Sequence, residues 1–72
     1  MNELCHRISD ILKYECGQIT YQYNDGKLVA DLDCYAITGY SAKALLELAR
    51  ENDRTCIITI QAIDNPKIQI VL

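Results

Sequence analysis

The hydrophobic residues of this chain of 72 residues change their spacing along the sequence, and this change limits the folds available to it. Buried positions recur about every 3.6 residues in a helix and every two residues in a strand. The spacing here predicts a helix, two strands, a second helix and two more strands. The two hairpins within this order predict a largely antiparallel sheet.

The first predicted helix covers residues 2–16. Its apolar positions have helical spacing: Leu4, Ile8, Ile11 and Leu12. Asn2 is a candidate N-cap, and Gly17 is a candidate C-terminal stop.

A strand of alternating character follows, in which Ile19, Tyr21 and Tyr23 share one face. The turn sequence Asn24-Asp25-Gly26 favours a hairpin. The return strand is predicted over residues 27–37. One of its faces carries Leu28, Ala30, Leu32 and Cys34, and the other carries Val29, Asp31, Asp33, Tyr35 and Ile37.

A second helix is predicted over residues 42–52, with Ser41 as its N-cap and Asn52 at its end. Its apolar stripe comprises Ala42, Leu45, Leu46 and Ala49, broadened by Leu48. A second hairpin follows, with strands over residues 55–63 and 67–72 and a turn at Asp64-Asn65-Pro66. Its predicted inner face comprises Cys56, Ile58, Ile60 and Ala62 with Ile68, Ile70 and Leu72.

These elements predict one small α+β domain over residues 1–72: a four-stranded, mainly antiparallel sheet with both helices packed on one face. The opposite face combines polar residues with Val29, Ile57, Ile63 and Val71, which is too apolar for a fully solvated surface. We therefore expect a protein partner or a second copy of the chain there. The candidate binding residues are Asp31, Asp33, Tyr35, Ile57, Ile63 and Val71.

The charge and the N-terminal sequence bear on partners and compartment. Ten acidic and seven basic side chains give a net charge of -3, which argues against direct nucleic-acid binding. The chain begins without the pattern of a signal peptide, and its apolar runs are too short to span a membrane. We expect a cytoplasmic protein that does not bind membranes.

The four cysteines, at positions 5, 16, 34 and 56, include no C-x-x-C pair. Each lies within a hydrophobic pattern, so the favoured interpretation is four buried thiols that act as small hydrophobic residues in a reducing compartment. A disulfide framework, zinc binding and catalysis remain less favoured alternatives. We expect no metal and no cofactor.

Little in the sequence favours catalysis. His6 is the only histidine, and on a helix it does not face its neighbour Cys5. Asp31 and Asp33 share one strand face, but the ligand spacing of a calcium loop is absent. No glycine-rich phosphate loop is present. We therefore predict a protein without enzymatic activity or catalytic residues.

Two segments, residues 41–49 and 56–62, resemble the histidine-containing phosphocarrier (HPr) family. The first matches its helix start, with Ser41-Ala42-Lys43, and the second its Ile-Thr-Ile-x-Ala strand. The resemblance implies a phosphocarrier or related regulator, with His6 as the alternative phospho-acceptor. In that family the histidine follows a strand, whereas His6 lies within a predicted helix.

The sequence thus favours a small, non-enzymatic regulatory or protein-binding domain. One form of this hypothesis is an acidic inhibitor from a mobile element that blocks a host protein by mimicking nucleic acid. The acidic residues that would take part are Asp25, Asp31, Asp33, Glu47, Glu51 and Asp53.

Overall fold

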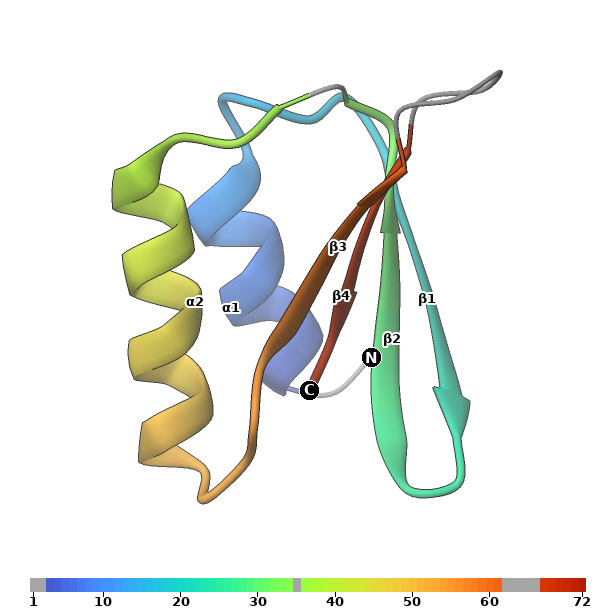
Figure 1. Cartoon of the computed structure of the whole chain (residues 1–72), viewed down its shortest axis with the longest axis vertical. Helices are drawn as coiled ribbons and strands as arrows, with labels where there is room; N and C mark the ends of the chain where they lie inside the picture. Colours follow the sequence, from blue (N-terminus) through green and yellow to red (C-terminus); the bar gives the residue numbers. More distant parts are fainter. Residues whose placement is uncertain (1–2, 35, 62–66) are drawn as a thin grey trace.

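The computed structural model describes residues 3–34, 36–61 and 67–72. It confirms the predicted order of elements and the α+β class (Figure 1). The helices are α1 (Glu3–Leu12) and α2 (Gly39–Glu51); the strands are β1 (Ile19–Asn24), β2 (Lys27–Leu32), β3 (Ile57–Gln61) and β4 (Lys67–Val71).

The four strands form one antiparallel sheet in the order β1-β2-β4-β3. The last strand in the sequence therefore lies inside the sheet, between β2 and β3. Ala30 on β2 and Ile58 on β3 both pair with Ile70 on β4. This register places the predicted inner faces of both hairpins on the same side of the sheet.

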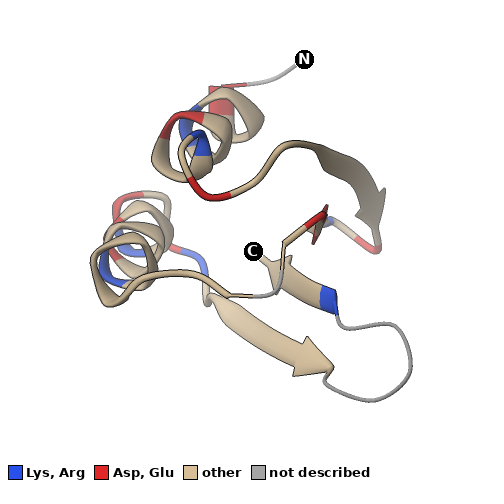
Figure 2. Ribbon diagram, turned by 90° about the horizontal axis from the view of Figure 1, so that it is seen from above, with Lys and Arg blue, Asp and Glu red and all other residues tan. Residues whose placement is uncertain are grey.

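Both helices cover that side, which makes a structure of two layers (Figures 1 and 2). Ile8 and Leu12 from α1, and Leu45 and Leu48 from α2, lose essentially all solvent contact against the sheet. Burying a side chain of this size stabilises the fold by about 1.5–3 kcal/mol. The sheet contributes Leu28, Ala30, Leu32, Ile68, Ile70 and Leu72 to this core.

The start of α2 differs from the prediction. Thr38, and not Ser41, is the N-cap: its hydroxyl accepts a hydrogen bond from the Ser41 amide at 3.1 Å. Ser41 lies inside the first turn and is only 8% exposed. The prediction of Ser41 was wrong because Thr38 also has a capping side chain and starts the helix earlier. The predicted end at Asn52 is confirmed.

Two other elements were predicted to extend further than they do. α1 ends at Leu12 and not near residue 16, and β2 ends at Leu32 and not at residue 37. The hairpin turn itself is confirmed, since Asp25 and Gly26 have φ values of 51° and 78°. Two successive positive φ angles match the twist of antiparallel strands.

Two residues predicted for the buried inner side are exposed: Leu46 on α2 and Ile60 on β3, which is 60% exposed. Leu46, placed in the buried stripe of α2, is 51% exposed, whereas Leu48 is buried. The stripe of α2 is therefore centred on Leu45, Leu48 and Ala49. The predictions for Asn2, Tyr35 and residues 62–66 lie outside the described residues. Within the part that is described, no helix is long and apolar enough to cross a membrane.

Candidate functional site

The side of the sheet away from the helices carries part of the predicted binding surface. Val29, Val71 and Ile57 form one row across β2, β4 and β3. Asp31, Gln69 and Thr59 form the next row. Three predicted binding residues, Asp31, Ile57 and Val71, therefore share this open face. Asp33 is exposed just beyond β2. Tyr35 and Ile63 lie outside the described residues.

Asp31 is fixed by its neighbours on the open face. Its carboxylate accepts a hydrogen bond of 2.9 Å from the Gln69 side chain and lies 3.4 Å from the Lys67 ammonium. The hydrogen bond from Gln69, aided by the positive charge of Lys67, holds the pKa of Asp31 below its usual range. Asp31 thus lies within a polar cross-strand cluster beside the apolar row.

β3 forms one edge of the sheet and exposes most of its side chains. Ile57 points to the open face and is 52% exposed, whereas Ile60 points to the helix side and is 60% exposed. Only Ile58 is half-buried. Figure 2 shows that β3 carries no charged residue. An uncharged, apolar edge strand is a template for pairing with another strand.

An open groove separates the C-terminal half of α2 from the beginning of β3. Its volume is about 450 Å³, and Leu46 and Cys56 lie on its two sides. Arg50 and Arg54 also line it. We call Leu46, Ile57 and Ile60 together the β3 edge surface. The groove gives this surface a place for a hydrophobic side chain.

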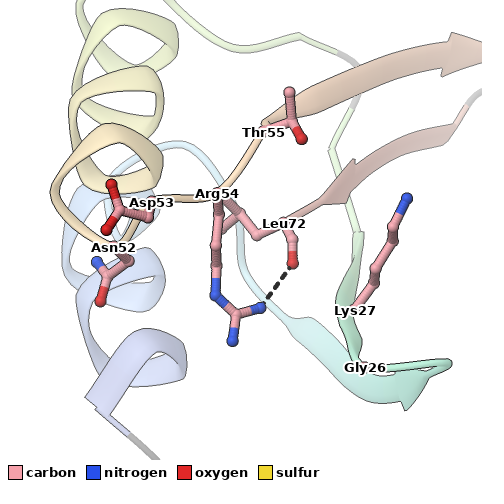
Figure 3. A pocket seen from close by; sticks show the side chains of 7 residues that line it. All are labelled: Gly26, Lys27, Asn52, Asp53, Arg54, Thr55 and Leu72. Carbon is pink, nitrogen blue, oxygen red and sulfur yellow. Dashed lines mark hydrogen bonds between the residues drawn. The ribbon is translucent and has the colours of Figure 1, made fainter.

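A second, more polar hollow of about 380 Å³ lies where the end of α2, the start of β2 and Leu72 meet (Figure 3). Arg54 points into this region and donates a hydrogen bond of 2.9 Å to the Leu72 carbonyl oxygen. Lys27 lies on the opposite side. Because Arg54 donates a hydrogen bond to a backbone carbonyl oxygen, the local structure accounts for its position, and no ligand is needed to explain it.

A polar cluster that the sequence did not predict connects the segment after α1 to the start of α2. The Glu15 carboxylate accepts hydrogen bonds from the Thr38 amide, at 2.7 Å, and from the Ser41 hydroxyl. The bond from Ser41 is the main reason that the pKa of Glu15 lies below its usual range. A carboxylate is also favoured beside the positive end of a helix.

The cysteines are less uniformly buried than predicted. Cys5 and Cys16 are buried, whereas Cys34 and Cys56 are only half-buried. Burial raises the pKa of Cys56. The sulfur atoms of Cys16 and Cys34 lie 2.6 Å apart. The predicted hairpin could have indicated this proximity: extending its observed register from Ile19 and Leu32 places Gly17 opposite Cys34.

The alternative phospho-acceptor, His6, is exposed within α1. Among residues 3–34, 36–61 and 67–72, no group of three or more histidine, cysteine or acidic side chains is arranged to hold a metal ion. No protein-family model, no curated protein and no solved structure matches the chain.

Proposed function

We propose that this protein is a small, non-enzymatic protein-binding domain that takes up an extended segment of its partner along β3. The observation that carries the proposal is the exposure of Ile57 and Ile60 on an uncharged edge strand. Strand addition would satisfy the outward backbone groups of β3 and cover apolar side chains on both faces.

The groove beside Leu46 supports the same proposal. A partner strand added to β3 alternates its side chains between the open face and the helix side. On the helix side, one apolar side chain of the partner would lie over Ile60, and another, further along the partner strand, would enter the groove between Leu46 and Cys56. On the open face, it would extend the row of Val29, Val71 and Ile57.

The charges favour this surface over acidic mimicry. Asp31 is paired with Lys67, and Glu51 lies 3.7 Å from Arg7. Figure 2 shows acidic and basic residues close together on the helices. Paired charges produce a weaker outward field than an uninterrupted acidic patch. An inhibitor that binds through β3 remains compatible with the proposal.

The test compares the immobilised wild-type chain with two variants in capture from an extract of the source cell. Ile60→Lys places a charge on the β3 edge surface. Tyr23→Lys is the matched control, because Tyr23 is 54% exposed on the opposite edge strand. We expect a protein that is captured by wild type and Tyr23→Lys and lost with Ile60→Lys. Hydrogen exchange in the complex should then show protection of the amides of residues 57–61.

Sedimentation at several concentrations separates the possible partners. A dimer that forms in the wild type and not in Ile60→Lys supports the β3 edge surface and makes a second copy the partner. Equal capture by all three proteins, or no captured protein and no dimer, contradicts the proposal. A greater loss on reversing Asp33 and Glu47 than with Ile60→Lys also contradicts it, in favour of acidic mimicry.

A further inference from the structure

Cys16 and Cys34 are brought together by two separate connections of the fold. Cys16 lies between α1 and β1, and its amide donates a hydrogen bond of 3.0 Å to the Leu12 carbonyl oxygen. Cys34 follows β2, where the neighbouring Asp33 amide donates a bond of 3.0 Å to Gln18. Hydrogen bonds of the backbone therefore hold the segments that carry both thiols.

The two sulfur atoms are closer than an ordinary packing contact. Their separation is 2.6 Å. Non-bonded carbon atoms, which are smaller than sulfur, pack at about 3.5–4.0 Å. The sulfur atoms of a disulfide are about 2.05 Å apart. The separation of the two thiols thus lies between a packing contact and a covalent bond.

We propose that Cys16 and Cys34 form a site of reversible oxidation, at which an intramolecular disulfide closes when the protein meets a low-molecular-weight disulfide. In the first step the Cys34 thiolate attacks one sulfur of the oxidant, which releases one thiolate and leaves a mixed disulfide on Cys34. The Cys16 thiolate then attacks the Cys34 sulfur and releases the second thiolate. The two protons lost by the cysteines pass through solvent to the released thiolates, so the oxidant is reduced to two thiols.

The environments of the two thiols explain this order of attack. Cys34 is half-buried and can meet the oxidant, whereas Cys16 is buried. Burial, together with the hydrogen bond to Cys34, raises the pKa of Cys16 to about 12. Cys16 is therefore protonated near neutral pH, which leaves the more accessible Cys34 as the first nucleophile.

Closure would join the two connections at one end of the molecule. Glu15, which precedes Cys16, already holds the start of α2 through Thr38 and Ser41. The disulfide would add a covalent link beside these hydrogen bonds. The proposal does not depend on partner binding at β3, because that strand forms a different part of the structure.

Peptide mapping of the full chain tests the proposal directly. Trypsin cleavage after basic residues would separate the four cysteines into the peptides 1–7, 14–27, 28–43 and 55–67. After incubation with oxidised glutathione, we expect the peptides 14–27 and 28–43 to be joined, in a protein that runs as a single chain on a non-reducing denaturing gel. The protein should lose the mass of two hydrogen atoms and retain two titratable thiols after denaturation. Reduction should restore all four.

Two variants provide the controls. Cys56→Ser keeps the pair intact and should give the same joined peptides as the wild type. Cys34→Ser removes one partner and should give no joined peptides; the result in wild-type protein does not depend on whether this variant folds. Four titratable thiols after oxidation, a stable glutathione adduct without closure, or joined peptides that include 1–7 or 55–67 in place of the expected pair would overturn the proposal.

Discussion

The two edges of the sheet, β1 and β3, are both uncharged strands, but they expose different chemistry. On β1, Ile19 and Tyr21 are half-buried against the core, and the exposed positions are Thr20, Gln22, Tyr23 and Asn24. On β3, isoleucines occupy two of the exposed positions. An edge strand that exposes polar residues is less prone to further pairing than one that exposes isoleucines.

Tyr21 provides a direct connection between the β1 edge and a helix. Its hydroxyl donates a hydrogen bond of 3.0 Å to the Cys5 carbonyl oxygen and lies 2.6 Å from the Ser9 hydroxyl. Burial raises the pKa of Tyr21, although the contact with Ser9 opposes this shift. β1 therefore contributes to holding the fold together, whereas β3 leaves apolar side chains exposed.

The largest expected difference between the edges is in stability. Tyr21→Ala should lower the free energy of unfolding by about 2–4 kcal/mol, because packing and two polar contacts are lost. Ile60→Ala should lower it by about 0.5 kcal/mol or less, because its side chain is mostly exposed. Urea denaturation of both variants measures this difference. Equal losses of stability would mean that the β1 and β3 edges contribute equally to holding the fold together.

A smaller effect is expected at the segment that leads from α1 into β1. Glu15→Gln should lower the free energy of unfolding near neutral pH by about 1–2 kcal/mol, because a charged acceptor of two hydrogen bonds is lost. The pKa of Glu15 is lowered by folding, so its stabilising effect is present above the pKa of the unfolded chain. This contribution is lost as the pH falls through the folded pKa.

The pH dependence of unfolding provides the measurement for Glu15. The difference in stability between wild type and Glu15→Gln should shrink as the pH is lowered through the acidic range. Asp31→Asn serves as a comparison, because its pKa is also lowered but its partners, Gln69 and Lys67, lie on β4. A difference for Glu15→Gln that stays constant with pH would contradict the role of its charge.

The hydroxyl of Tyr21 allows a finer test of the β1 edge. Tyr21→Phe should lower the free energy of unfolding by about 1 kcal/mol, since it removes the polar contacts and keeps the ring. Tyr23→Phe on the same strand is the matched control and should change stability by less than about 0.5 kcal/mol. Thermal or urea unfolding checks both values. Equal changes in the free energy of unfolding of the two variants would mean that the contacts of the Tyr21 hydroxyl with α1 do not stabilise the fold.

The smallest effect on stability is expected at the β3 edge surface. Ile60→Lys should change the free energy of unfolding by about 0.5 kcal/mol or less, because the added charge stays in water. The same variant is expected to abolish capture of the partner. A large loss of stability, measured by urea denaturation, would show that Ile60 belongs to the core.

The sequence predicted the class of each element well, because local periodicity decides it. The inner face of β4 was predicted from the alternation of Ile68, Ile70 and Leu72, and the register confirms it. The N-cap was misplaced because Thr38 and Ser41 are both capping residues, and local sequence does not decide between them. Leu46 fits the helical period, but it lines the open groove between α2 and β3 and is 51% exposed.

The candidate site was less predictable, since it depends on the order of strands. Ile57 and Val71 were expected to share the open face, and their pairing follows from the hairpin. That β3 lies at an edge, with Ile60 exposed on the helix side, follows from the insertion of β4 beside β2. The proximity of Cys16 and Cys34 could have been expected by extending the hairpin register beyond Ile19 and Leu32, although both cysteines lie outside the strands.

The position of β4 also has a consequence for the way the protein is made. β4 pairs with both β2 and β3, so residues 67–71 join the two halves of the sheet. During synthesis, α1, β1, β2, α2 and β3 emerge from the ribosome before the strand that connects them. Until then, the apolar inner sides of β2 and β3 remain without their common neighbour. The nascent chain therefore passes through a stage in which it is prone to aggregate and is a suitable client for chaperones.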